Sequence, residues 1–256
     1  MADISLNSVG LNFGPYRALH NLSFEVPQGQ FVALVGPTGC GKSSVLHLVA
    51  GLLKPSAGTV FTGGRALDAI NRDAVYMFQQ DALLPWKTSI ENVMLGPILR
   101  GTPKAEAARD AQSWLERVGL RELTERYPSQ LSGGQRKRVA MAQALINRLP
   151  ILLMDESFSA LDVQTRALME DKLLELWQEL GATVLFVTHD LEEAIAMADR
   201  VLLFTAGPGA GLKGDYPVPL PRPRNVAEAR FIPGFAGIYE TVWRHLKEEV
   251  MATYAR

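Results

Sequence analysis

Residues 36–43 read Gly-Pro-Thr-Gly-Cys-Gly-Lys-Ser. The stretch fits the pattern G-x-x-x-x-G-K-[ST], a loop whose backbone N–H groups surround the phosphates of a nucleotide. Gly36, Gly39 and Gly41 permit the backbone to turn successive N–H groups inward. An apolar strand pattern precedes the loop and a helical pattern follows it. Because strand, glycine loop and helix occur in that order, a chance glycine-rich turn is a poor alternative.

Two side chains of this phosphate loop (residues 36–43) carry the expected chemistry. Lys42 reaches the β- and γ-phosphates, and Ser43 supplies a hydroxyl to Mg²⁺. By itself the loop predicts only a bound nucleotide, a property shared by kinases, GTPases and motors. The other residues expected to contact the nucleotide here are Pro37, Thr38, Cys40 and Ser44.

The composition is that of an ordinary globular protein, with 256 residues, 47% hydrophobic residues and a formal net charge of −1. So balanced a charge gives no electrostatic argument for nucleic acid as a partner. The single cysteine, Cys40, favours a reducing, cytosolic setting. The start lacks the basic and apolar regions of a secretory signal, and the longest apolar stretch, 45–53, is too short to span a bilayer. Action at a membrane would therefore require a partner.

Several short apolar runs predict an α/β fold. Continuous apolar character suits parallel strands that are covered on both faces. Such strands are expected at 31–35, 74–78, 151–154, 183–187 and 200–204. Residues 21–26 instead alternate apolar and polar side chains, which predicts a half-buried strand in an antiparallel hairpin or sheet.

We expect one domain with a helical insert. Residues 86–148 contain helical patterns at 104–118 and 132–147 and no convincing strand. They would interrupt a core formed by 1–85 and 149–205.

The segment 206–256 is expected to form a tail. Its first part, 206–224, carries four glycines and five prolines, and we predict that it forms no regular structure. An amphipathic helix is expected over 238–251. This tail could regulate the protein, stabilise a dimer or simply cover the core.

The strand at 151–154 runs into two carboxylates, Asp155 and Glu156. Ligands bind at the carboxyl ends of parallel strands, so Asp155 would lie beside the phosphate loop and hold Mg²⁺. Glu156 would then polarise an attacking water. A solvated turn is the plain alternative, but the presence of the phosphate loop makes it a poor one.

A second candidate for phosphate binding is the signature segment, Leu-Ser-Gly-Gly-Gln at 131–135. Ser132 and Gln135 match a capping box, which offers a purely structural explanation. A plain cap has no use for Gly133 and Gly134, since glycine weakens a first helical turn. Helix starts carry unpaired N–H donors that bind anions. Because one nucleotide needs one phosphate loop, we predict that two copies of the chain close over shared ATP.

In the order of these motifs the chain resembles an ATP-binding cassette (ABC) ATPase over nearly its whole length. Within that superfamily it resembles the ATP-binding subunits of bacterial importers of the nitrate/sulfonate/taurine type. The closer likeness lies in 78–86 (Phe-Gln-Gln-Asp-Ala-Leu-Leu-Pro-Trp), 159–162 (Ser-Ala-Leu-Asp), 187–190 (Val-Thr-His-Asp) and 218–224 (Val-Pro-Leu-Pro-Arg-Pro-Arg). It implies a P-loop NTPase cassette with a mostly parallel core sheet, an N-terminal antiparallel β subdomain and a helical insert.

The resemblance also implies roles for three polar residues. Gln79 would contact Mg²⁺ and the water while linking the core to the helical insert. His189 would contact the γ-phosphate. Asp162 would lie at the dimer interface, and it could at the same time cap the helix that begins at 163.

The adenine is expected to stack on Phe13, with Tyr16 as the alternative and core packing as a rival role for Phe13. Leu83, Leu84 and Trp86 are equally consistent with core packing and with a groove for a membrane subunit's coupling helix.

Two residues depart from the importer pattern. Ser157 stands where proline is usual, which puts the stiffness of the turn behind Glu156 in doubt, and Gln143 stands where arginine is common.

The expected function is therefore ATP hydrolysis that drives import of a small solute, such as a nitrate-type oxyanion or an organosulfonate. Its implied partners are a second copy of the chain, two membrane permease subunits and, indirectly, a periplasmic solute-binding protein. Its implied place is the cytoplasmic face of the bacterial inner membrane. Two alternatives are a soluble ABC ATPase of DNA repair or translation, and a small-molecule kinase, although a kinase would not need the signature segment.

Overall fold

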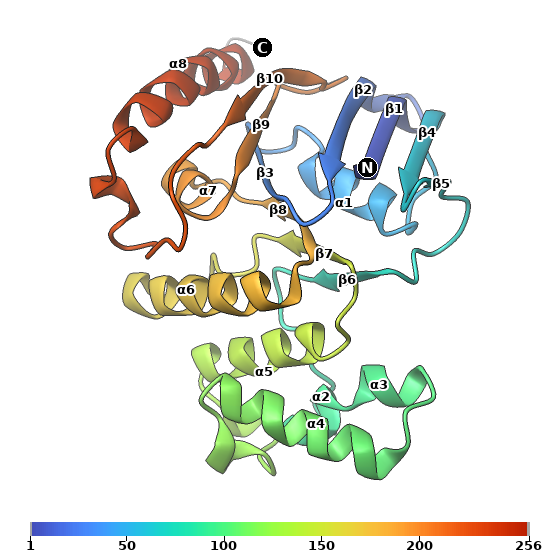
Figure 1. Ribbon diagram of the computed structural model, residues 1–256. Coiled ribbons are helices and arrows are strands. Elements are labelled where there is room, and N and C mark those ends of the chain that lie inside the picture. Colours follow the sequence, from blue (N-terminus) through green and yellow to red (C-terminus); the bar gives the residue numbers. More distant parts are fainter. Residues whose placement is uncertain (1, 255–256) are drawn as a thin grey trace.

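The computed structural model describes residues 2–254 and contains two β-sheets and the helices that pack against them (Figure 1). The larger sheet has the strand order β10-β9-β3-β8-β7-β6. Neighbouring strands from β9 to β6 are parallel, and β10 runs antiparallel along β9. The strands are β3 (Phe31–Val35), β6 (Ala74–Met77), β7 (Ile151–Asp155), β8 (Thr183–Val187), β9 (Arg200–Phe204) and β10 (Leu212–Pro217). The predicted mostly parallel sheet is confirmed.

The smaller sheet is antiparallel, with the order β2-β1-β4-β5. It consists of β1 (Ala2–Phe13), β2 (Tyr16–Pro27), β4 (Ala57–Thr62) and β5 (Arg65–Ala66). The strand predicted at 21–26 is the second half of β2. The apolar alternation of β1 is harder to read because its register shifts between Leu6 and Val9, where Ser8 has a φ of +51°.

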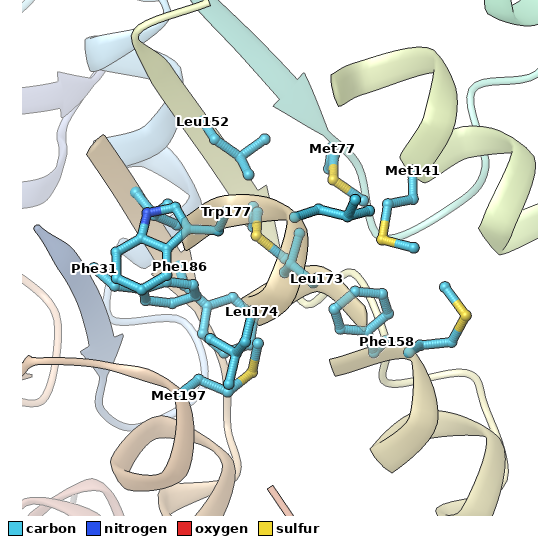
Figure 2. Close-up of a cluster of buried hydrophobic side chains, with 14 of the residues drawn as sticks. Phe31, Met77, Met141, Leu152, Phe158, Leu173, Leu174, Trp177, Phe186 and Met197 are labelled. Atoms are coloured by element: carbon cyan, nitrogen blue, oxygen red, sulfur yellow. The ribbon is translucent and has the colours of Figure 1, made fainter. Parts of the chain in front are cut away.

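Side chains of the parallel strands point alternately to two apolar layers. On one face, Val32 and Leu34 of β3 pack with helix α1 (Lys42–Val49) and with the antiparallel sheet. On the other face, Phe31 meets the ring of Trp177 edge-on at 5.3 Å (Figure 2). Trp177 lies on helix α6 (Val163–Leu180), which packs on this face. The continuous apolar runs thus reflect a sheet that is covered on both sides.

The helices predicted at 104–118 and 132–147 are confirmed as α4 (Lys104–Arg117) and α5 (Gly133–Leu145), and they lie in the lower part of Figure 1. Short α2 (Ser89–Val93) and α3 (Leu95–Leu99) precede them. Such five-residue helices have too few turns to show a periodic pattern. Within 86–148 the structure describes no strand. Two short 3₁₀ helices, Arg121–Leu123 and Pro128–Gln130, complete this region.

The prediction that 206–224 forms no regular structure is wrong, because β10 lies inside it. The prolines of the segment flank the strand or end it at Pro217, where they remove no needed donor. β10 is the edge strand of the sheet and pairs with β9 alone. An edge strand tolerates glycine and proline far better than a central one does. Composition alone missed this because it does not record where in a sheet a strand lies.

The predicted C-terminal helix is confirmed and is longer than expected, as α8 (Phe235–Tyr254). It follows the 3₁₀ helix Ala229–Phe231 and is held to β10 by polar contacts. Lys213 pairs with Glu249 at 2.9 Å, and the Tyr216 hydroxyl lies 2.6 Å from His245 Nδ1. The remaining helix is α7 (Leu191–Met197). Across residues 2–254, no helix has both the length and the apolar character that crossing a bilayer requires.

Candidate functional site

The phosphate loop joins the end of β3 to the start of α1, as the sequence predicts. Gly41 has a φ of +91°, and a Cβ there would lie 2.8 Å from Leu19 Cδ2, so no other residue fits without strain. A Cβ on Gly36 would lie 3.0 Å from Phe204 Cβ. Gly39 has a φ of +78° with open space around it. The loop is therefore shaped by its own turns and by close packing on β2 and β9.

Lys42 lies inside the phosphate loop with 7% of its surface exposed. Its ammonium donates to the carbonyls of Gly36 and Pro37 at 2.8 and 3.0 Å. Burial raises the pKa of the Cys40 thiol, and the nearby Lys42 charge opposes that rise. Thr38 is exposed and Ser44 partly buried. A cation thus lies inside the loop, held by two of its carbonyls, where it adds positive charge to a candidate phosphate site.

Ser43 and Asp155 meet although 112 residues separate them. The Ser43 hydroxyl donates to Asp155 Oδ1 at 2.9 Å, and the Tyr76 hydroxyl donates to Asp155 Oδ2 at 3.0 Å. Desolvation, followed by the negative charge of Asp155, raises the pKa of the Tyr76 phenol. A hydroxyl and a carboxylate beside a phosphate loop form an all-oxygen donor set of the kind Mg²⁺ prefers. The residues present fit this cation.

The Glu156 carboxylate lies close to two of the polar side chains that were expected near the reacting phosphate. Gln79 Nε2 donates to Glu156 Oε2 at 3.1 Å, and His189 Nδ1 lies 3.6 Å from the same oxygen. Glu156 also has a φ of +43°, an unusual conformation for a residue with a side chain. The Glu156 N–H donates to Val187 O at 2.9 Å. This hydrogen bond fixes the Glu156 backbone at the carboxyl ends of the parallel strands β7 and β8, next to His189.

Ser157 is buried, and its hydroxyl donates to Met77 O at 3.1 Å. This hydrogen bond ties the turn behind Glu156 to β6. The bond therefore supplies a constraint where the importer pattern has a proline ring.

The signature segment (residues 131–135) begins α5. Ser132 and Gln135 form the predicted capping box, with Ser132 N–H donating to Gln135 Oε1 at 2.9 Å. A Cβ on Gly134 would lie 3.0 Å from Thr165 Cγ2, whereas a Cβ on Gly133 would meet only Arg136 Nη2, at 3.9 Å. In the described chain, the hydrogen bonds of these residues are made with near neighbours along the chain, such as Pro128 and Arg136, and none reaches the phosphate loop. Figure 1 shows α5 in the helical part, well apart from α1.

Asp162 caps α6, as predicted, by accepting from Thr165 N–H at 3.0 Å. That backbone hydrogen bond lowers the pKa of the Asp162 carboxyl. The same turn holds Ser159, whose hydroxyl donates to Glu156 O at 2.9 Å. The turn at 159–162 is thus connected to the Glu156 backbone.

Phe13 and Tyr16 face each other at the tip of the β1–β2 hairpin and are 49% and 48% exposed. The hairpin runs beside the phosphate loop, since Leu19 touches Gly41. Phe13 is not among the buried core residues, so the core-packing alternative is wrong.

Sequence reasoning missed two residues near the site. One is Tyr76, for which the sequence predicts only a place in the strand at 74–78. The other is Lys137 of α5, which is 3% exposed, donates to Gln79 O at 3.0 Å and pairs with Asp81 at 3.1 Å. A signal for Lys137 existed, because it lies on the apolar face of α5 with Met141, where a charge requires a partner.

The comparisons with known proteins agree on one family. The family profile described as "ABC transporter" matches residues 19–159, more than half of the chain. The chain is 46% identical over 239 residues to the aliphatic sulfonates import ATP-binding protein SsuB of Shigella flexneri serotype 5b (strain 8401), covering 93% of this chain and 90% of the relative. It is 46% identical over 244 residues to SsuB of Escherichia coli (strain K12), covering 95% and 92%.

A solved structure is also similar: the ATP-binding cassette MJ0796, described as a dimer in a post-hydrolysis state bound to ADP and Pi. It has a TM-score of 0.73 and 31% identity, over 84% of this chain and 98% of that chain. These findings confirm the family and the fold class expected from the sequence. The chain belongs to the ABC transporter family, in the group of import ATP-binding subunits that includes the aliphatic sulfonate proteins.

Proposed function

We propose that this importer ATPase powers the uptake of a small organosulfonate or a related oxyanion. The proposal is supported by the names of relatives that match over nine-tenths of their length. These relatives do not favour the alternative of a soluble ABC ATPase in DNA repair or translation. A cassette of this kind works with permease subunits, and we place it at the cytoplasmic face of the inner membrane. A periplasmic solute-binding protein would deliver the solute.

The proposed mechanism gives each of these side chains one role. The phosphate loop would bind the β- and γ-phosphates through its N–H groups and Lys42, while Ser43, Asp155 and Gln79 would hold Mg²⁺. When bound there, the cation would supply positive charge that offsets the negative charge developing on the phosphates. Glu156 orients and polarises the attacking water, and His189 contacts the γ-phosphate. The observation that carries this proposal is the meeting of Gln79 and His189 at one oxygen of Glu156.

The second part of the proposal is a head-to-tail dimer. Ser132, Gly133, Gly134 and Gln135 of one copy would face the nucleotide held by the phosphate loop of the other, with Asp162 at the interface. In support, the signature segment makes only local hydrogen bonds in the described chain. A single helix start attracts a surface anion by only about 0.3–1 kcal/mol, so closure requires several such contacts at once.

The docking surface for the permease is proposed along the helical part. A groove of about 190 Å³ between β6 and α5 is lined by Phe78, Leu99 and Gln143 among others. Trp86 is 70% exposed, whereas Leu83 packs against the core. Of the two roles left open for Leu83, Leu84 and Trp86, core packing thus suits Leu83. Contact with a membrane subunit is proposed for the exposed Trp86, which does not itself line this groove.

The test is growth of a strain that lacks this gene on a sulfonate as the sole sulfur source. We expect the deletion strain to fail on the sulfonate and to grow on sulfate, with rescue by the wild-type gene and none by Glu156→Gln. Normal growth of the deletion strain on sulfonates, combined with failure on nitrate as sole nitrogen source, would redirect the substrate proposal to nitrate. Normal growth on both would count against uptake of either solute.

Replacing Phe13 with alanine should weaken ATP binding, because stacking of a base on an aromatic ring is worth about 1–3 kcal/mol, or roughly 5- to 150-fold in Kd. Tyr16→Ala is the matched control on the facing strand, and we expect a change below about 3-fold for it. Both can be measured with a fluorescent ATP analogue. A larger loss for Tyr16→Ala than for Phe13→Ala would assign the adenine contact to Tyr16.

A further inference from the structure

Tyr76 contacts Asp155, the carboxylate to which we assign Mg²⁺ binding. Tyr76 lies on β6 and Asp155 at the end of β7, and these parallel strands are neighbours. Its hydroxyl donates to Asp155 Oδ2 at 3.0 Å, while the other oxygen, Oδ1, accepts from Ser43. Each carboxylate oxygen therefore has its own partner.

The Tyr76 ring is held in place by aromatic neighbours. It stacks with Phe78 at a centroid distance of 4.3 Å and with His47 of α1 at 5.5 Å. A stacked ring loses little further freedom when its hydroxyl makes a hydrogen bond, so the phenol is a preorganised donor. The direction of the hydrogen bond from the Tyr76 hydroxyl to Asp155 Oδ2 is thus set by the packing of the Tyr76 ring, outside the nucleotide site.

This arrangement has a consequence for cation choice. Mg²⁺ is small and takes one oxygen from each carboxylate it uses, whereas Ca²⁺ accepts both oxygens of one carboxylate. Partners behind a metal ligand fix its orientation, and their removal typically lowers metal affinity by 10–100-fold.

We propose that Tyr76 is a positioning residue that engages Oδ2 of Asp155, so that a single oxygen faces Ser43 and the site selects Mg²⁺ over Ca²⁺. This inference rests on the proposed role of Asp155 in holding the cation. It goes beyond that role because it assigns the cation preference to a phenol that does not touch the cation.

The plain alternative is that Tyr76 is a partly buried phenol whose hydroxyl simply needs an acceptor. Removal of the hydroxyl would then change thermal stability but would leave the cation preference unchanged. The two interpretations therefore differ in one measurable quantity, the ratio of ATP affinities in Mg²⁺ and in Ca²⁺.

The experiment uses Tyr76→Phe, which removes one oxygen and keeps the stacked ring. The matched control is Tyr216→Phe, which also removes a hydroxyl with one hydrogen bond, to His245, in the tail. The Kd of a fluorescent ATP analogue is measured for the full chain in Mg²⁺, in Ca²⁺ and in EDTA, and melting temperatures are recorded without nucleotide. Tyr76→Leu, which also removes the ring, is a second variant for which we expect the same loss of preference.

For Tyr76→Phe we expect affinity in Mg²⁺ to fall by about 10-fold, with affinity in EDTA and in Ca²⁺ unchanged within about 2-fold. Tyr216→Phe should keep the wild-type ratio. A wild-type ratio for both Tyr76 variants would overturn the inference. Asp155→Asn tests the proposed metal role of Asp155 separately from the role of Tyr76. If Mg²⁺ raised the ATP affinity of that variant over its affinity in EDTA as much as it does for wild type, the metal role of Asp155 itself would be overturned.

Discussion

Replacing Glu156 with glutamine should reduce ATP hydrolysis by about 10²–10⁴-fold while leaving ATP binding intact. The amide has nearly the same shape as the carboxylate but cannot accept a proton from the attacking water. Gln79 and His189 both lie close to one oxygen of Glu156. Within the described chain, no other carboxylate is shown in contact with both of these side chains. Because hydrolysis reopens the proposed dimer, slow hydrolysis should also preserve the closed state.

The measurement has two parts: steady-state phosphate release, and size-exclusion chromatography with Mg-ATP. We expect Glu156→Gln to elute as a dimer with ATP and as a monomer with ADP. The control is Glu175→Gln, an exposed residue of α6 that pairs with Lys172. It should keep wild-type turnover. Normal turnover in Glu156→Gln would remove Glu156 from the mechanism, and a monomeric variant in ATP would count against the dimer.

Replacing Glu170 with glutamine should stabilise the fold at neutral and alkaline pH. Glu170 of α6 is 3% exposed, and its Oε1 atom is buried without a hydrogen-bond partner. Burial, followed by the neighbouring Glu193, raises the pKa of Glu170 to about 10. Burial also raises the pKa of Glu193, whose carboxylate accepts from Thr188. The other charges facing the pair are Arg166 and Asp190.

The direction in which stability changes with pH follows from the number of protons bound in the folded and unfolded states. With a folded pKa above the unfolded value, the folded protein binds more protons, so stability is full below the ordinary value of about 4.3 and declines as pH rises toward about 10. Glutamine cannot ionise and so avoids this loss. We expect Glu170→Gln to add about 2 kcal/mol at pH 8, or roughly 4–8 °C in Tm, and little at pH 5.

Thermal denaturation of both proteins between pH 5 and pH 9 provides the test. Glu175→Gln lies on the same helix and loses the same charge at an exposed position, so its effect should stay within about 0.5 kcal/mol at every pH. A Glu170→Gln variant that is less stable than wild type at pH 8 would show that Glu170 acts as a needed charge rather than as a buried acid.

Much of the fold was predictable because its signals are local. β3, β8 and β9 begin and end at the predicted residues, since a buried parallel strand is a continuous apolar run. The capping box at Ser132 is equally local, because its partners are three residues apart. β10 was missed for a different reason: most glycines and prolines of 206–224 lie outside the strand, and the single proline within it, Pro217, is tolerated because β10 lies at the sheet edge.

The sequence by itself determined which groups are candidates for the chemistry: the phosphate loop, the Asp155–Glu156 pair and the signature segment each predict a phosphate or cation contact through residue type and short spacing. Only the tertiary structure decided which of these groups meet. Strand order brings Tyr76 to Asp155, 79 residues away, and Gln79 to Glu156, 77 residues away. Backbone patterns are set by near neighbours, whereas such contacts depend on how whole strands pack. Among the described residues, the same packing leaves the signature segment without a hydrogen bond to the phosphate loop of its own chain, which is why we propose a pair as the working unit.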